Sequence, residues 1–173
     1  MKTFVKIIAT SVIAMVCIAS ISEARAEENE TLSDRQKKII PIATFTASGN
    51  MQKLEIALSE GLDAGLTVNE IKEILVHTYA YAGFPRALNG IAIYMAVLDK
   101  RKEQGINDKT GKEATPVPSD FDRSGYGHKV RNALVGRDIS KPTSGYPVFT
   151  PIMDQFLVEH LFADIFSRDV LSH

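Results

Sequence analysis

Apolar residues between positions 32 and 104 recur every three or four residues, which is the spacing of one face of an α-helix. Residues that cap or end helices divide this stretch. Ser33 and Gln36 have the form of a capping box before the first helix, and Ser48-Gly49-Asn50 separates that helix from a second. Gly65 is well placed to end the second helix in a left-handed conformation.

Two further helices follow in the same stretch. Thr67-Val68-Asn69-Glu70 has the form of a capping box that opens a third helix, and Gly83 closes it. Pro85 suits the first turn of a fourth helix, because an N–H at that position would have no partner in any case. Lys100-Arg101-Lys102 and Gly105 mark its end. Since strand patterns are absent here, the sequence predicts an all-α fold for residues 32–104.

The character of the chain changes after this helical domain. Residues 105–150 are rich in proline and glycine, which is typical of a linker or a long arm, with room for a short helix around 129–134. Such an arm either wraps a neighbouring subunit or forms a mobile connector. Thr150-Pro151 opens another amphipathic helix, and we expect this last segment, 151–173, to be cut short after it. The apolar side of that helix includes Phe156, Leu161, Phe162 and Phe166.

The first 26 residues have the pattern of a secretory signal peptide. Lys2 and Lys6 are followed by an uncharged, mostly apolar run over 7–21 and then by the small-x-small pattern Ala24-Arg25-Ala26. This run is shorter than the roughly 20 residues that cross a bilayer. We expect cleavage after Ala26, a polar leader over 27–31, and a periplasmic or secreted protein; a retained membrane anchor is the less favoured alternative.

Removal of residues 1–26 changes the composition in two ways. The single cysteine, Cys17, lies there, so the mature chain has no disulfide, thiolate metal site or cysteine nucleophile. A lipid anchor on Cys17 is a less favoured alternative to cleavage. The mature chain keeps 17 of 20 basic and 20 of 21 acidic side chains, a net charge of about −3. That charge predicts no nucleic-acid partner and no membrane association after cleavage.

Two motifs in the helical domain are specific enough to indicate a family. Residues 62–75, LDAGLTVNEIKEIL, and 79–87, YAYAGFPRA, resemble the carboxymuconolactone decarboxylase family, which includes the alkylhydroperoxidase D-type thiol peroxidases. The resemblance implies an antiparallel helical bundle of the alkylhydroperoxidase D-like type and a homo-oligomer, a trimer or hexamer. Residues 154–169 look like the beginning of a second copy, as in exported two-copy members, and this copy would be truncated.

The same resemblance indicates which chemistry is absent. Counted back from Gly65, the two cysteines of the peroxidase branch fall on Asn50 and Lys53, and its histidine falls on Ala57. Because the thiolate is the nucleophile in that branch, we reject thiol peroxidase activity. Many decarboxylase-type members also carry a histidine at the position of Ala57, so its absence weakens the prediction of decarboxylase activity.

The remaining candidate chemistry lies on the third helix. Glu73, His77 and Tyr81 follow one another at intervals of four residues and so form a stripe. A carboxylate beside an imidazole favours the charged ring, and a phenol can donate to a developing enolate. The alternative is a solvated helix face with an ordinary Glu–His pair. Arg86, in the first turn of the fourth helix, could hold a substrate carboxylate, or it could be a surface arginine that covers the preceding turn.

The histidines do not indicate a metal. His160 falls on the apolar side of the last helix, where a packing role is the better interpretation, and His128 and His173 have no informative context. Their spacing matches no metal-ligand pattern, and we expect no cofactor. Two functions stay open: a lyase or isomerase that acts on a carboxylated lactone or enolisable acid, and a non-catalytic helical oligomerisation or binding module.

Overall fold

The computed structural model describes residues 32–117 and 120–171; the expected signal peptide and leader, and His173, lie outside them. The described residues form helices and irregular connections without a strand, which confirms the all-α class. None of the described helices is both long enough and apolar enough to cross a bilayer.

The chain divides into two units, Met1–Lys37 and Lys38–His173. The described part of the first holds the short helix α2, Asp34–Lys37. Its expected capping box is present, because the Ser33 N–H donates to Gln36 Oε1 at 2.9 Å and the Gln36 N–H donates to Ser33 Oγ at 3.2 Å.

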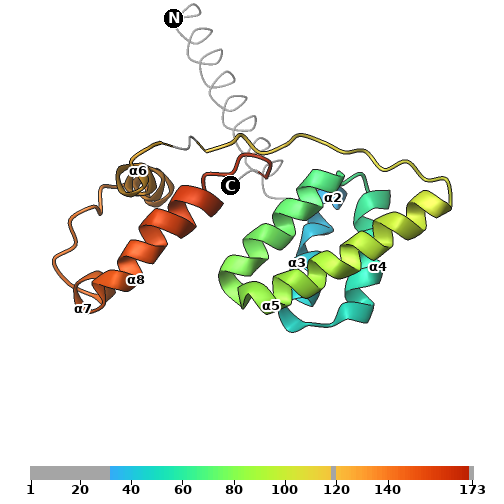
Figure 1. Ribbon diagram of the computed structural model, residues 1–173, viewed down its shortest axis with the longest axis horizontal. Helices are drawn as coiled ribbons and strands as arrows, with labels where there is room; N and C mark the ends of the chain where they lie inside the picture. The colour runs from blue at the N-terminus through green and yellow to red at the C-terminus, as the bar shows by residue number, and fades with distance from the viewer. Residues whose placement is uncertain (1–31, 118–119, 172–173) are drawn as a thin grey trace, which may run out of the picture. The chain divides into compact units, whose positions relative to one another are not determined.

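Three helices build the core of the second unit: α3 (Ile39–Ser48), α4 (Met51–Asp63) and α5 (Val68–Glu103), each in contact with the other two. Figure 1 shows α3 and α4 lying against α5. The apolar residues that recur at helical spacing in α4 and in the first half of α5 meet between them. The second half of α5 differs, because Leu88 and Met95 are about 60% exposed and Tyr94 and Val97 are buried instead. The largest fully buried side chains are Ile42, Thr46, Leu54, Leu58, Ile71 and Leu75.

The predicted start and stop residues act as expected. Gly49 ends α3 with a left-handed φ of 73°, and Asn50 caps α4 by accepting the Lys53 N–H at 3.2 Å. Thr67 accepts the Glu70 N–H at 3.3 Å, while the Glu70 carboxylate accepts the Thr67 N–H at 2.8 Å. The connections between helices are therefore fixed by local hydrogen bonds.

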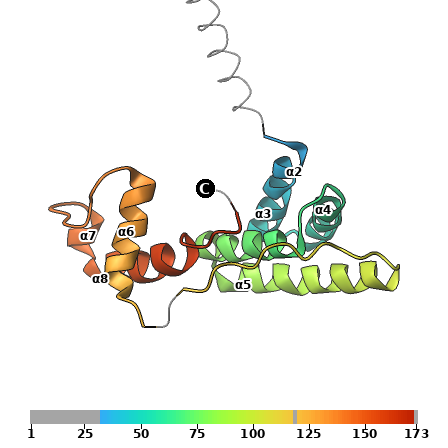
Figure 2. The same ribbon diagram turned by 90° about the horizontal axis from the view of Figure 1, so that it is seen from above.

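Helix α5 is two helices joined at a sharp break. Gly83 has φ 79° and ψ 165°, a backbone conformation open almost only to glycine, and Pro85 follows in the first turn of the second half. The second half returns along the first, so that the Tyr94 hydroxyl donates to the Val68 carbonyl at 3.2 Å. Figure 2 shows the two halves side by side, which agrees with the predicted third and fourth helices.

The first part of the arm that follows α5 runs back to the N-terminal end of α5 and bonds to it. The carbonyls of Lys109 and Thr110 accept the N–H groups of Val68 and Asn69, both at 2.9 Å. These two N–H groups belong to the first turn of α5 and have no partner within the helix. The arm thus completes the N-terminal cap of α5.

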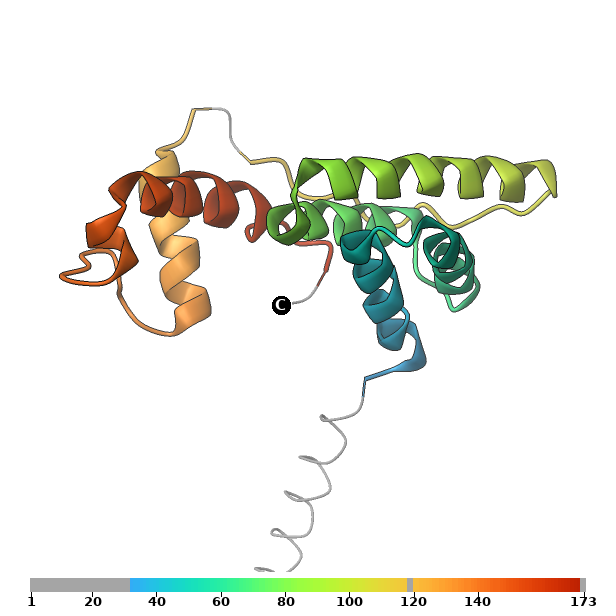
Figure 3. The ribbon, with the colours of Figure 1, turned by 90° about the horizontal axis from the view of Figure 1, so that it is seen from below.

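The last helices form a second packed group within the same unit. They are α6 (Arg123–Val135), α7 (Tyr146–Phe149), α8 (Pro151–Phe156) and the wider π-helix η1 (Leu157–Ile165), which continues α8. Figure 3 shows α6 (orange) crossing this last helix (red). Helix α6 packs on η1, and Gly127 lets its backbone approach Val158 closely. On the predicted apolar side of the last helix, Phe156 is 60% exposed, whereas Leu161, Phe162 and Phe166 are half-buried.

Candidate functional site

Two of the predicted site residues line one pocket. His77 and Tyr81 border a pocket of about 350 Å³, here called the His77 pocket. Thr78 and Ile74 also line it from α5, and Leu171 contributes from the C-terminal segment. The opposite wall comes from the small and apolar side chains of α3, namely Ile39, Ala43 and Ala47. The pocket is therefore mostly apolar, with one imidazole and one phenol at its edge.

The backbone holds His77 in one tautomer. Its Nδ1 lies 2.9 Å from the carbonyl oxygen of Glu73, one turn earlier in α5. Since a carbonyl can only accept, Nδ1 carries the proton and Nε2 is the acceptor atom of the neutral ring. The imidazole also stacks against Phe166, with ring centroids 6.2 Å apart. The ring can therefore act as a base only through Nε2.

Glu73 has a different partner from the one that the sequence suggested. Its side chain is buried, with 5% of the residue exposed, and its carboxylate accepts two hydrogen bonds from Arg168 at 2.5 and 2.7 Å. These hydrogen bonds raise the pKa of the Arg168 guanidinium, in spite of its partial burial. Glu73 touches His77 through its backbone, and its charge is neutralised by Arg168.

Tyr81 stands at the solvent edge of the pocket. It is 76% exposed, and its ring centroid lies 6.4 Å from that of Phe166. Phe166 thus stands beside both His77 and Tyr81. The three residues of the predicted stripe therefore differ in exposure, so the stripe is not a solvated face: Glu73 is buried, His77 is half-buried and Tyr81 is exposed.

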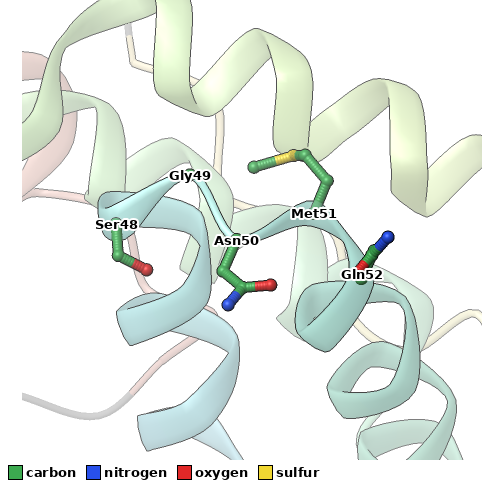
Figure 4. A pocket seen from close by; sticks show the side chains of 5 residues that line it. All are labelled: Ser48, Gly49, Asn50, Met51 and Gln52. Atoms are coloured by element: carbon green, nitrogen blue, oxygen red, sulfur yellow. The ribbon is translucent and has the colours of Figure 1, made fainter.

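Arg86 does not line the His77 pocket. Its guanidinium packs on the turn between α3 and α4. A Cβ atom added at Gly49 would lie 1.4 Å from Arg86 Nη1, so the guanidinium fills the space beside this glycine. This turn follows the C-terminal end of α3, which favours a cation. A separate open pocket of about 540 Å³ borders the same turn, lined by residues 48–52 (Figure 4).

The positions that matched the peroxidase catalytic residues have structural roles here. Asn50 caps α4, and the Lys53 ammonium lies 5.7 Å from the ring centroid of Phe45. Ala57 is 2% exposed and belongs to the apolar core. This part of α4 therefore serves packing and capping.

His160 is not the packing residue that the apolar pattern suggested. It is exposed and bonds to Tyr79 and to Asp164, at 2.7 and 2.9 Å. His128 also has a partner, since Arg131 Nη2 lies 3.0 Å from its Nδ1. Among the described residues, no cluster of three or more histidine and carboxylate side chains is arranged to hold a metal.

Sequence reasoning missed the contribution of the C-terminal segment. Phe166, Arg168 and Leu171 each contact the first half of α5 or the pocket beside it. They lie about ninety residues away in sequence, and no local pattern marks them as partners of α5. Their positions follow only from the packing of the last helix.

Together these features define a small all-α protein with an imidazole and a phenol at an apolar pocket between helices. A model of the carboxymuconolactone decarboxylase family matches residues 18–94. The match covers less than half of the chain and supports the family resemblance that the motifs indicated. A comparison with curated proteins finds no match.

Proposed function

We propose that the protein is an exported lyase or isomerase that acts on a small carboxylated lactone or enolisable acid at the His77 pocket. One observation carries the proposal: His77 and Tyr81, an acid/base group and a phenol, line the same apolar pocket. The family match supports the class of substrate. The signal-peptide pattern of residues 1–26 supports export.

The chemistry requires one proton donor and one group that stabilises an enolate. Loss of CO₂ from the substrate carboxylate leaves the bonding electron pair on carbon, delocalised as an enolate. The Tyr81 hydroxyl can donate to the enolate oxygen. His77 that has taken a proton from solvent at Nε2 can then deliver that proton to carbon and return to the neutral ring, while the Glu73 carbonyl holds the ring through Nδ1–H.

Arg168 and Arg86 have structural roles in this proposal and take no part in the proton transfer. Arg168 neutralises Glu73 and so fixes the C-terminal segment that brings Phe166 against the imidazole. Arg86 packs on the α3–α4 turn, so the proposal assigns it no contact with substrate. The apolar wall of α3 supports a small substrate with little charge beyond its carboxylate.

A test is the decarboxylation of a carboxylated muconolactone, followed by CO₂ release. We expect turnover by the mature protein and a loss of about 10²-fold in His77→Gln, the size typical of one acid/base group. Tyr81→Phe should lose less, because water reaches that edge of the pocket. His128→Gln is the matched control, since His128 bonds to Arg131 on α6 and lines none of the His77 pocket.

The alternative, a non-catalytic helical module, has its own support. Ala57 is buried in the core where many family members carry a histidine, and Tyr81 and Arg86 are exposed. In that case the fold would serve assembly or binding alone. Binding of the lactone without turnover, unchanged in His77→Gln, would favour this function.

We also propose that the protein forms a homo-oligomer, as the family resemblance implies. The second half of α5 supports this, because Phe84, Leu88 and Met95 are each about 60% exposed and lie on one face at helical spacing. Burying one such side chain stabilises an assembly by roughly 1.5–3 kcal/mol. A second copy of the chain, placed about a symmetry axis, is the occupant that we propose for this face.

We also propose that residues 154–169 are the beginning of a second, truncated copy of the helical domain, as their resemblance to the family suggests. In this chain they form the end of α8 and the whole of η1, which pack on α6. Phe166, within this segment, stacks against the His77 ring, which lines the His77 pocket. The segment therefore has a place in the proposed site whatever its origin.

A further inference from the structure

A chain of hydrogen bonds joins the first half of α5 to the last helix. Tyr79 Oη lies 2.7 Å from His160 Nε2, and His160 Nδ1 lies 2.9 Å from Asp164 Oδ2. An ionised carboxylate only accepts, so His160 Nδ1 carries the proton. Nε2 of the neutral ring therefore accepts the hydrogen bond from the Tyr79 hydroxyl.

Asp164 is held in its charged form. Burial tends to raise the pKa of its carboxyl, but hydrogen bonds from His160 and Arg123 outweigh burial and keep that pKa below the usual value. Arg123 Nη1 reaches the other oxygen, Oδ1, at 2.6 Å. Each carboxylate oxygen thus has a partner, which fixes both the direction of His160 and its tautomer.

The phenol of Tyr79 is also fixed in place. Its ring packs on Phe84, with centroids 4.1 Å apart, and meets the edge of the His160 ring at 5.7 Å. Phe84 follows the break at Gly83, so the turn between the two halves of α5 supports the tyrosine. In an oriented Tyr–His–Asp chain of this kind the imidazole can take the proton of the phenol, and the carboxylate then balances the charge of the imidazolium.

This chain borders a second pocket, of about 310 Å³, here called the Tyr79 pocket. Its polar groups are the Tyr79 phenol and the His160 imidazole; the rest of its lining is apolar or backbone. None of these residues lines the His77 pocket. The other lining residues are Ala80, Gly83, Phe156, Leu157 and Leu161.

We propose that the Tyr79 pocket is a separate site that binds a small, flat, mostly apolar molecule with one acidic hydroxyl, a phenol or an enol, and removes its proton. The ligand hydroxyl donates its proton to Tyr79 Oη while the Tyr79 proton moves to His160 Nε2. The ligand becomes an anion and His160 an imidazolium, whose charge Asp164 balances. No oxidant, reductant or cofactor takes part, and the apolar walls hold the ring of the ligand.

The test uses p-nitrophenol as the probe and the mature protein, because the nitrophenolate anion is coloured. We expect saturable binding in which the bound probe shifts towards nitrophenolate. Tyr79→Phe keeps the ring that packs on Phe84, so it should bind the probe and lose the shift. His160→Gln and Asp164→Asn, which nearly keep side-chain volume, should also lose it, and His128→Gln should retain it.

Two results would overturn the proposal: no saturable binding of p-nitrophenol by the folded protein, or a shift that persists in both Tyr79→Phe and His160→Gln. Circular dichroism confirms that each variant is folded before it is compared, and Asp164→Asn serves if His160→Gln does not fold. The result is independent of the proposed function, because no lactone is consumed. Turnover that survives in Tyr79→Phe while the probe shift is lost would separate the two sites.

Discussion

Arg168 donates two hydrogen bonds to the carboxylate of Glu73, at 2.5 and 2.7 Å, although the two residues are 95 positions apart in sequence. The Glu73 side chain is 6% exposed and that of Arg168 is 32% exposed, so the pair is shielded from water on the α5 side. It fixes the C-terminal segment beside the His77 pocket. This contact is the basis of the first prediction.

Glu73→Ala should lower the free energy of unfolding by about 2 kcal/mol, because it leaves the partly buried Arg168 guanidinium without its carboxylate. Glu55→Ala is the matched control: Glu55 also pairs with a basic residue, Lys100, but both side chains are at least half exposed. That change should cost less than about 0.5 kcal/mol. Urea unfolding measures both, and equal losses would contradict the structural role of the Glu73–Arg168 pair.

The contact between α6 and the last helix depends on one glycine. A Cβ at Gly127 would lie 1.9 Å from the Val158 carbonyl oxygen, so Gly127→Ala should destabilise the protein by about 1–3 kcal/mol. Gly125, two residues earlier in α6, would place its Cβ only against the movable Asp122 carboxylate. Gly125→Ala should be neutral or slightly stabilising. Thermal unfolding of the two variants compares them, and similar melting temperatures would exclude this packing.

Acid should weaken the attachment of the arm to the C-terminal segment. Hydrogen bonds from the Lys112 ammonium and from Thr115 hold the pKa of Asp169 below its usual value of 3.8. A depressed folded-state pKa contributes stability that is complete above the unfolded pKa and is lost as the pH falls through the folded one.

The wild-type unfolding free energy should therefore fall more steeply than that of Asp169→Asn between about pH 5 and about pH 2. Asp169→Asn should already be the less stable protein at pH 7, because it lacks the ion pair with Lys112. Urea unfolding across this pH range makes the comparison. Parallel pH profiles would show that Asp169 is not paired in solution.

Self-association through α5 should be sensitive to a charge on its exposed apolar face. Leu88→Glu places a carboxylate at the middle of that face and should shift the protein towards monomers, because a buried, unpaired charge opposes association. Asn89→Glu adds the same charge one residue away, off the face, and should leave the assembly unchanged. Light scattering at micromolar concentration measures the molar mass of both variants and of the wild-type protein. A wild-type monomer would contradict the oligomer proposal.

Local signals explain which parts of the fold the sequence could predict. Capping boxes at Ser33 and Thr67, the cap at Asn50 and the break at Gly83 depend on neighbours within a few residues, and each lies where the sequence placed it. The short helix expected around 129–134 is present as the longer α6. Helical spacing also identified the core faces of α4 and of the first half of α5, where Leu58 and Leu75 are fully buried. It failed for the second half of α5, where Leu88 and Met95 are exposed and Tyr94 is buried instead.

The candidate site was less predictable, because its partners come from distant segments. The sequence placed Glu73 beside His77, but a buried carboxylate needs a charged partner, and Arg168 supplies it from beyond the last helix. The apolar neighbours of His160 in the sequence predict a packing role for it. Its bond to Tyr79 depends on how the last helix meets α5, which helical spacing does not encode.

The most direct test of acid/base chemistry at the His77 pocket is proton exchange with solvent. The mature protein is incubated with a carboxylated muconolactone in D₂O, and proton NMR follows deuterium at the carbon that is reprotonated. We predict deuterium in the product, or in recovered substrate if the enzyme is an isomerase, at a rate reduced about 10²-fold in His77→Gln and unchanged in His128→Gln. No incorporation above the protein-free rate, or incorporation that is equal in His77→Gln, would contradict the account.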